Sequence, residues 1–502
     1  MAEPSLRRDV RGLARKSIIY GVGSVLVRGV SLFVLPLYTR FLSPSEYGTV
    51  ALGTTLTALL SIVFPLGLQN AIGPFFYSEK SETERKRRCG TIWLTMVIAA
   101  LVLAVLLDQL GAPLFTALFP KLSYSPFVRL AIWTAFLNVF ALFPLNVAQI
   151  RERAGEYVFL TGASVIVTVA FVVVFVVFLH KGAYGYMLGA LLANSVLAVP
   201  FIFLAMRESI LRIDRRKLRP VLGFSLPLIV HGIASWALSL SDRAILQRYV
   251  SLFDLGVYSV GYQIGSVMIM IGMAIANAWN PFLFRRAAEA GESAKPGLSK
   301  LVTYFTMTIA VIAVFLCLFA REIIDLLSSQ SFHAAYSIVP IVVAAYFWNS
   351  LYVVPAGFLL LEKKTNYLPI ATVIAGILNV TLNFLFVPRF GIIAAAWSTF
   401  WAFLVLFLIV WLVALRTYPF PYEYGRISIV IAFASALVLL GVAIATTDLG
   451  SVLLKLLLVA TIPVALAWSP FLRDSERRAL RSAVASARNR ITRAAGPTGS
   501  KS

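Results

Sequence analysis

The residues most able to do chemistry are a few ionisable side chains inside long apolar stretches of this 502-residue sequence. Arg28 lies at the middle of the apolar run 17–39, and His231 lies near the centre of the run 221–241. A guanidinium at such a depth can hold a phosphate through paired hydrogen bonds, or it can contact carbonyl groups of a neighbouring helix. The histidine can donate to a ligand, take up a proton, or bond to another helix. Both residues are predicted binding residues.

A second group of candidates stands at or near the ends of apolar runs. Asp242 and Arg243 end the run that holds the histidine, where they can gate a cavity, bind a ligand, or act as a local cap. Asn70, Gln263 and Asn280 carry uncharged amides that suit sugar hydroxyl groups, although hydrogen bonding between helices explains most such residues. These five residues complete the predicted binding site.

The motifs of common enzyme and metal sites are missing. The sequence contains no P-loop, no G-x-S-x-G and no H-E-x-x-H, and its cysteines and histidines form no metal-ligand cluster. We therefore predict a protein that is not an enzyme and that uses no metal or other cofactor. The centres of the apolar runs also lack carboxylates, so the buried charge is positive and suits an anionic ligand better than an organic cation.

The composition indicates that membrane helices position these residues. Apolar residues make up 60% of the chain and charged residues 13%, whereas soluble domains carry about 25% charged residues. A crossing needs roughly 20 apolar residues in a helix that bonds its own backbone, so the chain can form about fourteen. The predicted spans are 17–39, 48–72, 91–110, 126–148, 157–179, 183–206, 221–241, 256–279, 301–320, 335–358, 367–388, 391–415, 427–446 and 450–470.

The charge distribution predicts the orientation of these spans. The net charge is +22, from 44 Lys and Arg against 22 Asp and Glu, which in a soluble protein would suggest nucleic acid. In this chain, 34 of the 44 basic residues lie in the two ends and in alternate connectors. Cytoplasmic loops collect Lys and Arg, so we expect both ends in the cytoplasm, an even number of spans and no nucleic-acid partner.

An internal repeat relates the two halves of the chain. Segment 40–48 matches segment 248–256 at an offset of 208 residues, with Arg, an aromatic, an aliphatic residue, Ser, an acid and Gly recurring in order. Gly182 and Gly391 match at nearly the same offset. Six spans separate the copies, which predicts two parallel six-helix bundles around a central cavity, with two extra C-terminal helices. Duplicated bundles are typical of alternating-access transporters, but they also serve as scaffolds or enzymes.

The predicted organisation has six parts. A basic N-terminus precedes a first lobe of six spans, a basic linker leads to a second lobe, and two extra spans precede a basic tail. Apolar tail residues at helical spacing among arginines predict either an interfacial helix on anionic lipids or a partly ordered cytoplasmic tail. In order, the parts are residues 1–16, 17–206, 207–220, 221–415, 427–470 and 471–502.

Several short stretches resemble the polysaccharide-export branch of the multidrug/oligosaccharidyl-lipid/polysaccharide (MOP) exporter superfamily, which contains the Wzx-type flippases. The resemblance extends over roughly residues 10–420 and is carried by motifs near the ends of spans. These motifs are LPLYTRFLSPSEYG at 35–48, LGLQNAI at 66–72, FSLP at 224–227, SDRAIL at 241–246, GVYS at 256–259, and 379–388 with Gly391.

This resemblance implies a flippase that moves an undecaprenyl-diphosphate-linked oligosaccharide across the bacterial inner membrane, for synthesis of an O-antigen or exopolysaccharide. The diphosphate of such a substrate suits Arg28, and we expect an ion gradient to drive transport instead of ATP. The expected partners are the lipid-linked oligosaccharide, anionic membrane lipids, and, as candidates, a polysaccharide polymerase and a chain-length regulator.

Three other functions fit parts of the sequence. A multidrug and toxin extruder of the same superfamily would usually have twelve spans and acidic cation sites. A membrane polymerase or ligase that joins sugar repeats would need a catalytic loop outside the cell, and the predicted outer connectors are short. A non-transporting partner that organises glycosyltransferases at the membrane is also compatible with the sequence.

Overall fold

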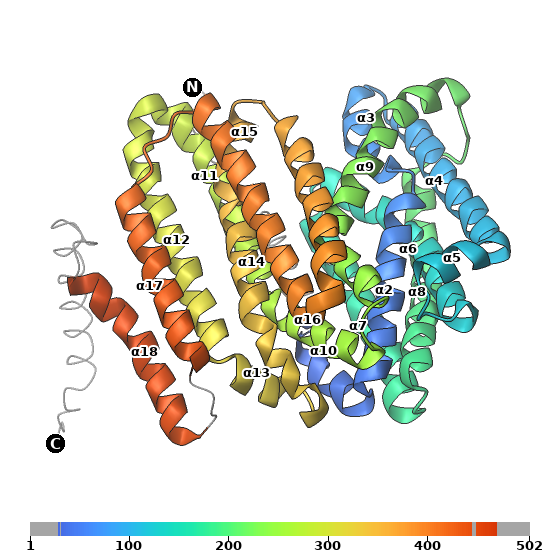
Figure 1. Ribbon diagram of the computed structural model, residues 1–502. Coiled ribbons are helices and arrows are strands. Elements are labelled where there is room, and N and C mark those ends of the chain that lie inside the picture. The colour runs from blue at the N-terminus through green and yellow to red at the C-terminus, as the bar shows by residue number, and fades with distance from the viewer. Residues whose placement is uncertain (1–28, 31, 444–447, 469–502) are drawn as a thin grey trace, which may run out of the picture. The chain divides into compact units, whose positions relative to one another are not determined.

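The computed structural model describes residues 29–30, 32–443 and 448–468, and every regular element in this part of the chain is a helix (Figure 1). This agrees with the predicted all-α class. The chain divides into two compact units. Unit 1 contains residues 1–298 and 320–420, and unit 2 contains residues 299–319 and 421–502. The predicted lobes 17–206 and 221–415 stay a prediction.

Unit 1 holds most of the helices. They are α2 (Pro44–Val63), α3 (Ile72–Ser78), α4 (Glu82–Leu110), α5 (Ala112–Leu118), α6 (Arg129–Ile150), α7 (Ala154–Val173), α8 (Gly182–Glu208), α9 (Arg215–Leu246), α10 (Leu252–Gly265), α11 (Val267–Ala290), α13 (Ala320–Leu327), α14 (Val339–Leu351), α15 (Val353–Leu361) and α16 (Tyr367–Thr417). Unit 2 holds nearly all of α12 (Lys295–Leu318), together with α17 (Tyr424–Ala443) and α18 (Leu449–Trp468).

Ten helical segments in the described residues are long and apolar enough to cross a membrane. One of them, Leu252–Leu318, contains α10, α11 and α12, and another, α16, covers the predicted spans 367–388 and 391–415. The first predicted span begins outside the described residues, so the count of fourteen stays a prediction. A multi-pass membrane protein follows from these ten segments.

Side chains on the outer surfaces of these helices agree with a lipid environment. In α7 and α8, the side chains of Phe159, Ile166 and Phe203 are 72%, 67% and 62% exposed. Many exposed large apolar side chains are unusual in a water-soluble monomer. In lipid they lie in a medium of their own polarity, as expected of membrane-spanning helices.

Helix α16 is two helices joined at a glycine. Gly391 has φ +59 and ψ −137, a conformation that a residue with a Cβ atom adopts only with strain. Gly182, which precedes the body of α8, also has a positive φ of +55. The two glycines that match in the sequence therefore share an unusual backbone conformation, and each stands where one apolar segment meets the next.

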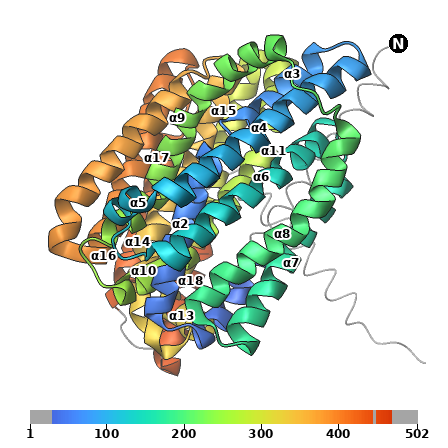
Figure 2. The ribbon, with the colours of Figure 1, turned by 90° about the vertical axis from the view of Figure 1, so that its right-hand side faces the viewer.

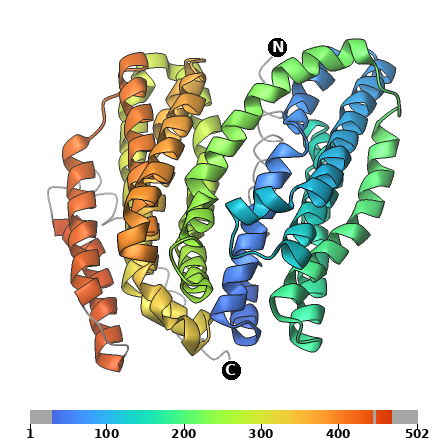
Figure 3. The ribbon, with the colours of Figure 1, turned by 45° about the vertical axis from the view of Figure 1, so that its right-hand side comes forward.

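Helix α9 connects the two groups of helices in unit 1. Figure 1 shows α4, α5, α6 and α8 gathered on one side, and α11, α14, α15 and α16 on the other. Helix α9 packs against both α2 and α16, and Figure 3 shows it running between the helices of these two groups. On one side α8 packs against α6 and α7, and Figure 2 shows α7 and α8 side by side.

The repeated segments 40–48 and 248–256 start α2 and α10 in the same way. Ser43 precedes α2 and accepts a hydrogen bond from the backbone N–H of Glu46, while the Glu46 carboxylate accepts from the backbone of Ser43. Ser251 precedes α10 and accepts from the backbone N–H of Asp254 in the same manner. Such caps satisfy backbone donors that a helix start leaves free, and they fix where each helix begins.

The two capped helix starts pack against each other through glycines. A Cβ atom on Gly48 would overlap the carbonyl oxygen of Leu252, and one on Gly256 would overlap the carbonyl oxygen of Pro44. Each glycine therefore touches the backbone of the other copy, and the contact is reciprocal. The two copies of the repeat predicted from the sequence, 40–48 and 248–256, therefore contact each other where α2 crosses α10.

The predicted basic linker 207–220 is fixed along the start of α4. The backbone N–H of Ile210 donates to the carbonyl of Lys86 at 2.9 Å, and the Thr91 hydroxyl donates to the carbonyl of Arg212 at 2.9 Å. Nearby, Arg151 forms ion pairs with Glu82 and Glu208. Burial lowers the pKa of the Arg151 guanidinium, but these carboxylates hold that pKa above its usual value. The linker is therefore ordered: residues 207–208 end α8, residues 215–220 begin α9, and only the segment between them is non-helical.

Candidate functional site: a polar cavity in unit 1

A cavity of about 1200 Å³ lies in unit 1, and side chains from α2, α6, α7, α8, α9, α10, α14 and α16 contribute to its lining. Its polar lining consists of hydroxyl groups, amides, one histidine and one arginine. None of the described residues that line it is an aspartate or a glutamate. A pocket of this size within membrane helices accommodates a ligand larger than a typical drug.

Arg243 is the single charged residue among the described residues that line the cavity. Its side chain is held next to Asp242, with Nη1 3.1 Å from the carboxylate oxygen Oδ1, and both residues are buried at 8% and 2% exposure. The Tyr258 hydroxyl donates to the other carboxylate oxygen. Removing one partner of such a buried ion pair leaves the other charge uncompensated, at a high energetic cost.

Tyrosines fix the position of the arginine. The guanidinium carbon of Arg243 lies 4.3 Å from the ring centre of Tyr262, within cation–π distance. The Tyr262 hydroxyl donates to the carbonyl of Ser239 at 3.0 Å and lies 2.7 Å from the hydroxyl of Tyr346. The arginine is therefore pre-oriented by the ring of Tyr262 from α10, which contacts Tyr346 of α14, and it presents N–H donors to the cavity.

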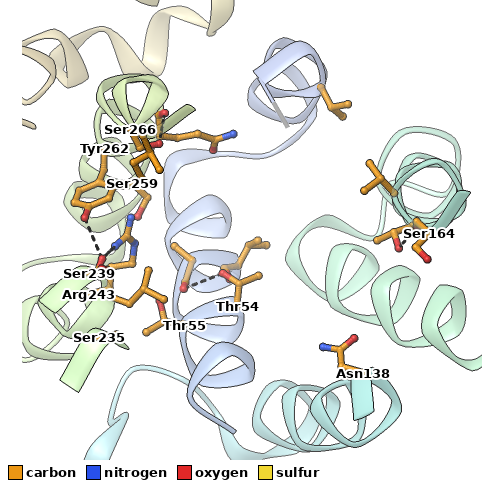
Figure 4. A pocket seen from close by; sticks show the side chains of 18 of the residues that line it. Thr54, Thr55, Asn138, Ser164, Ser235, Ser239, Arg243, Ser259, Tyr262 and Ser266 are labelled. Carbon is orange, nitrogen blue, oxygen red and sulfur yellow. Dashed lines mark hydrogen bonds between the residues drawn. The ribbon is translucent and has the colours of Figure 1, made fainter. Parts of the chain in front are cut away.

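A different set of side chains faces the cavity from α6, α7 and α8. Figure 4 shows Asn138 and Ser164 on one side of α2, and Arg243 and Tyr262 on the other. The hydroxyl-bearing residues of α7 that line the cavity recur every three or four positions and so lie on one helix face. The polar residues of this side are Asn138, Thr161, Ser164, Thr168 and Asn194.

The cavity brings together three of the seven predicted binding residues. His231, Arg243 and Gln263 line it, and Asp242 lies directly behind the arginine. The Nδ1 atom of His231 is buried without a hydrogen-bond partner among the described residues, so a bond from that atom to a neighbouring helix is not its role. Gln263 accepts a hydrogen bond from the Tyr47 hydroxyl at 2.6 Å.

The other predicted residues lie elsewhere. Asn70 is exposed in a short helical turn after α2, and Asn280 lies in α11 beside Gly357 of α15; neither lines the cavity. Arg28 lies outside the described residues. The pair Asp242 and Arg243 does not cap the end of a helix as the local alternative would require, because α9 continues to Leu246.

A buried cluster of amides and hydroxyls ties α9 to both arms of α16. The Ser241 hydroxyl lies 3.4 Å from Oδ1 of Asn379, and Nδ2 of Asn383 donates to the same oxygen at 3.0 Å. Nδ2 of Asn379 is 3.5 Å from the Thr399 hydroxyl. Contacts between helices explain Asn379, as expected of most uncharged polar groups in membrane helices, while Asn383 bonds to Asn379 within its own helix.

Sequence reasoning missed the hydroxyl face of α7 and the tyrosines around the arginine. The α7 residues carried a signal, because Thr161, Ser164 and Thr168 interrupt an otherwise apolar run at helical spacing. The tyrosines carried none, since Tyr262 and Tyr346 are 84 residues apart and meet only through packing.

Residues 37–337 match the family described as polysaccharide biosynthesis protein. The chain belongs to this family. The matched part covers more than half of the sequence and includes α2 through η5 (Gln330–Ser337), with most of the cavity-lining helices. The predicted resemblance to proteins of polysaccharide biosynthesis is confirmed by this match.

Curated relatives of this chain share limited identity with it. It is 24% identical over 277 residues to "Lsg locus putative protein 1" of Haemophilus influenzae, a match that covers 54% of this chain and 65% of that protein. It is 21% identical over 402 residues to the "Probable low-salt glycan biosynthesis flippase Agl15" of Haloferax volcanii, a match that covers 78% of this chain and 81% of that protein.

Solved structures share the fold of this chain. The "Lipid II flippase MurJ, inward closed conformation" superposes with a TM-score of 0.69 at 12% identity, covering 89% of this chain and 98% of that one. An inward-facing multidrug resistance MATE family transporter of the MOP superfamily superposes with a TM-score of 0.60 at 15% identity, covering 81% and 99%. At these identities the comparison establishes the fold alone.

Proposed function

We propose that this protein is a flippase that moves an undecaprenyl-diphosphate-linked oligosaccharide across the bacterial inner membrane for surface polysaccharide synthesis. The observation that carries the proposal is the cavity of about 1200 Å³, lined by hydroxyls, amides and Arg243 and by none of the described carboxylates. A lipid-linked oligosaccharide has an anionic diphosphate that suits arginine and sugar hydroxyls that suit the neutral polar lining. Family membership and the relative named as a glycan biosynthesis flippase support the same substrate class.

The crossing of α2 and α10 supports transport by alternating access. The predicted orientation puts both termini in the cytoplasm, and it puts the starts of α2 and α10 at the outer face. In this arrangement the reciprocal glycine contact of Gly48 and Gly256 closes the outer end of the pathway. Parting of the two helix starts then opens the cavity to the outer leaflet, and an ion gradient drives the cycle.

Partners follow from this role. The substrate is the lipid-linked oligosaccharide, and the basic ends 1–16 and 471–502 contact anionic lipids of the inner leaflet. A polymerase and a chain-length regulator act on the translocated units at the outer face. Arg28 lies in the predicted first span and serves as a second cation for the diphosphate.

A flipping assay with purified protein tests the proposal. Proteoliposomes carry a fluorescent undecaprenyl-diphosphate disaccharide, and a glycosidase added outside cleaves only sugars that have reached the outer leaflet. We expect cleavage to pass the half-way plateau of protein-free liposomes without ATP, and to slow when ionophores collapse the proton and sodium gradients. A plateau equal to that of protein-free liposomes would contradict the flippase assignment. An unchanged rate with both gradients collapsed would remove the ion coupling.

The same vesicles separate this function from drug extrusion. A multidrug extruder needs carboxylates for organic cations, and the described lining of the cavity has none. We therefore expect no gradient-driven uptake of ethidium by proteoliposomes that flip the lipid-linked disaccharide.

A further inference from the structure

The α7 side of the cavity presents hydrogen-bond acceptors. Thr161, Ser164 and Thr168 donate their hydroxyl protons to the carbonyls four residues earlier in the same helix, at 2.7, 2.8 and 2.8 Å. Asn194 of α8 likewise donates from Nδ2 to the carbonyl of Ala190 at 2.8 Å. A hydroxyl has one proton and two lone pairs. Because the protons of these three α7 hydroxyls are used within the helix, their oxygens can only accept hydrogen bonds from a ligand.

The opposite side of the cavity presents donors. Arg243 offers guanidinium N–H groups, and its charge is held in place by Asp242 and the ring of Tyr262. An anionic group is attracted to this side, whereas it meets only acceptor oxygens on the hydroxyls of α7. Figure 4 shows the two sides separated by α2, with Ser164 on one side and Arg243 on the other.

We infer that the cavity is a two-part site that fixes the orientation of its ligand, with the diphosphate on the Arg243 side and a neutral, hydroxyl-rich sugar on the α7 side. This inference rests on the proposed function and adds the substrate class: the sugar next to the diphosphate is uncharged. Sugar hydroxyls are donors and match the acceptor face of α7. A carboxylate on that sugar would lack donors on α7 and would be left poorly paired there.

Binding of three short-chain probes to purified protein tests the inference. They are citronellyl diphosphate, the same compound carrying N-acetylglucosamine, and the same compound carrying glucuronic acid. In the wild type we expect the neutral sugar to lower Kd about tenfold, equivalent to ~1.4 kcal/mol, and the acidic sugar to lower it much less.

Variants locate the gain in affinity. The α7 triple variant combines Thr161→Val, Ser164→Ala and Thr168→Val. In this variant the neutral sugar should no longer lower Kd, while the Kd of citronellyl diphosphate stays within about twofold of wild type. Replacing the third change by Thr168→Ser restores one acceptor and should recover part of the gain. The matched control is Ser195→Ala, because Ser195 also donates to its own helix but does not line the cavity.

A second variant separates the two parts of the site. Asp242→Asn combined with Arg243→Gln removes the ion pair without leaving one charge alone, and it should weaken all three probes by the same factor. If the gain from the neutral sugar survives in the α7 triple variant, or if the acidic sugar binds as well as the neutral one, the inference is wrong. Wild-type protein that binds none of the probes would instead contradict the proposed function.

Discussion

Helices α2 and α10 begin alike but present different chemistry to the cavity. Both follow a serine cap, both carry an acid three residues after that serine, and both place a glycine at their mutual crossing. About two turns further along, the copies differ: Thr54 and Thr55 of α2 line the cavity, and the residues at the same offset in α10 are Tyr262 and Gln263.

This comparison separates the framework from the site. Backbone geometry at the crossing constrains both copies equally, because each glycine must admit the backbone of the other helix. The cavity-facing positions have no such constraint and carry small hydroxyls on one side, but an aromatic ring and an amide on the other. The duplicated framework therefore encloses a cavity whose two sides need not bind the same chemical group.

The largest expected effect comes from Arg243, whose side chain and ion-pair partner are held by tyrosines of α10. Arg243→Gln leaves Asp242 buried without its charged partner, and removing one member of a buried pair costs about 3–5 kcal/mol. We expect a large fall in the melting temperature of the purified protein and loss of flipping. The double change with Asp242→Asn should recover most of the melting temperature but no flipping.

The control for this experiment is Arg40→Gln. Arg40 is exposed, begins the first repeat and does not line the cavity, so its loss should leave both measurements near wild type. Wild-type flipping by the double variant would show that the arginine does not hold the substrate.

The reciprocal glycine contact gives the next largest effect, and it should be equal for the two copies. Gly48→Ala and Gly256→Ala each put a methyl group into the backbone of the partner helix, and overpacking of this kind costs about 1–3 kcal/mol. We expect each variant to slow flipping at least tenfold by pushing the closed crossing apart.

Gly223→Ala in α9 is the matched control, because a Cβ atom there meets no other atom within 4 Å. Should Gly48→Ala and Gly256→Ala differ strongly from one another, the reciprocal contact would not be the feature that governs the crossing.

A smaller and unequal effect is expected at the positions where the copies diverge. Tyr262→Phe removes a hydroxyl that donates to Ser239 and contacts the Tyr346 hydroxyl, a loss of about 1 kcal/mol. Thr54→Val removes a hydroxyl that bonds only within its own helix, so its effect on stability should be smaller. Thermal unfolding in detergent measures both, and a larger effect at position 54 would argue against the asymmetry.

The smallest effects should come from the caps, and they should again be equal. Ser43→Ala and Ser251→Ala each remove a side-chain cap, which costs about 1 kcal/mol. Because both helix starts are exposed, water can bond to the backbone N–H groups that lose their cap, and this offsets part of the cost. Matching small decreases in melting temperature are expected, with flipping nearly unchanged.

The sequence predicted much of this architecture because lipid imposes strict rules on it. Long apolar runs had to be helices, and the matched glycines Gly182 and Gly391 stand at equivalent breaks. Arg243, Gln263 and His231 were found as cavity residues because polar side chains in apolar runs are costly unless used.

Other features could not be found in this way. The run with His231 was predicted to end at residue 241, but α9 continues to Leu246, since the adjacent charges of Asp242 and Arg243 pair with each other and stay buried. Asn70 and Asn280 have the right chemistry but lie on turns and faces away from the cavity, which depends on how the helices pack.

The distance between the two helix starts tests the central claim, that the crossing of α2 and α10 opens during transport. Spin labels at Ser45→Cys and Phe253→Cys, both exposed positions, report this distance by double electron–electron resonance in a protein with Cys89 and Cys317 replaced by alanine. We predict one short distance for the protein alone, and a second, longer distance once the lipid-linked disaccharide and an ion gradient are supplied. A single short distance in protein that is flipping its substrate would contradict the account.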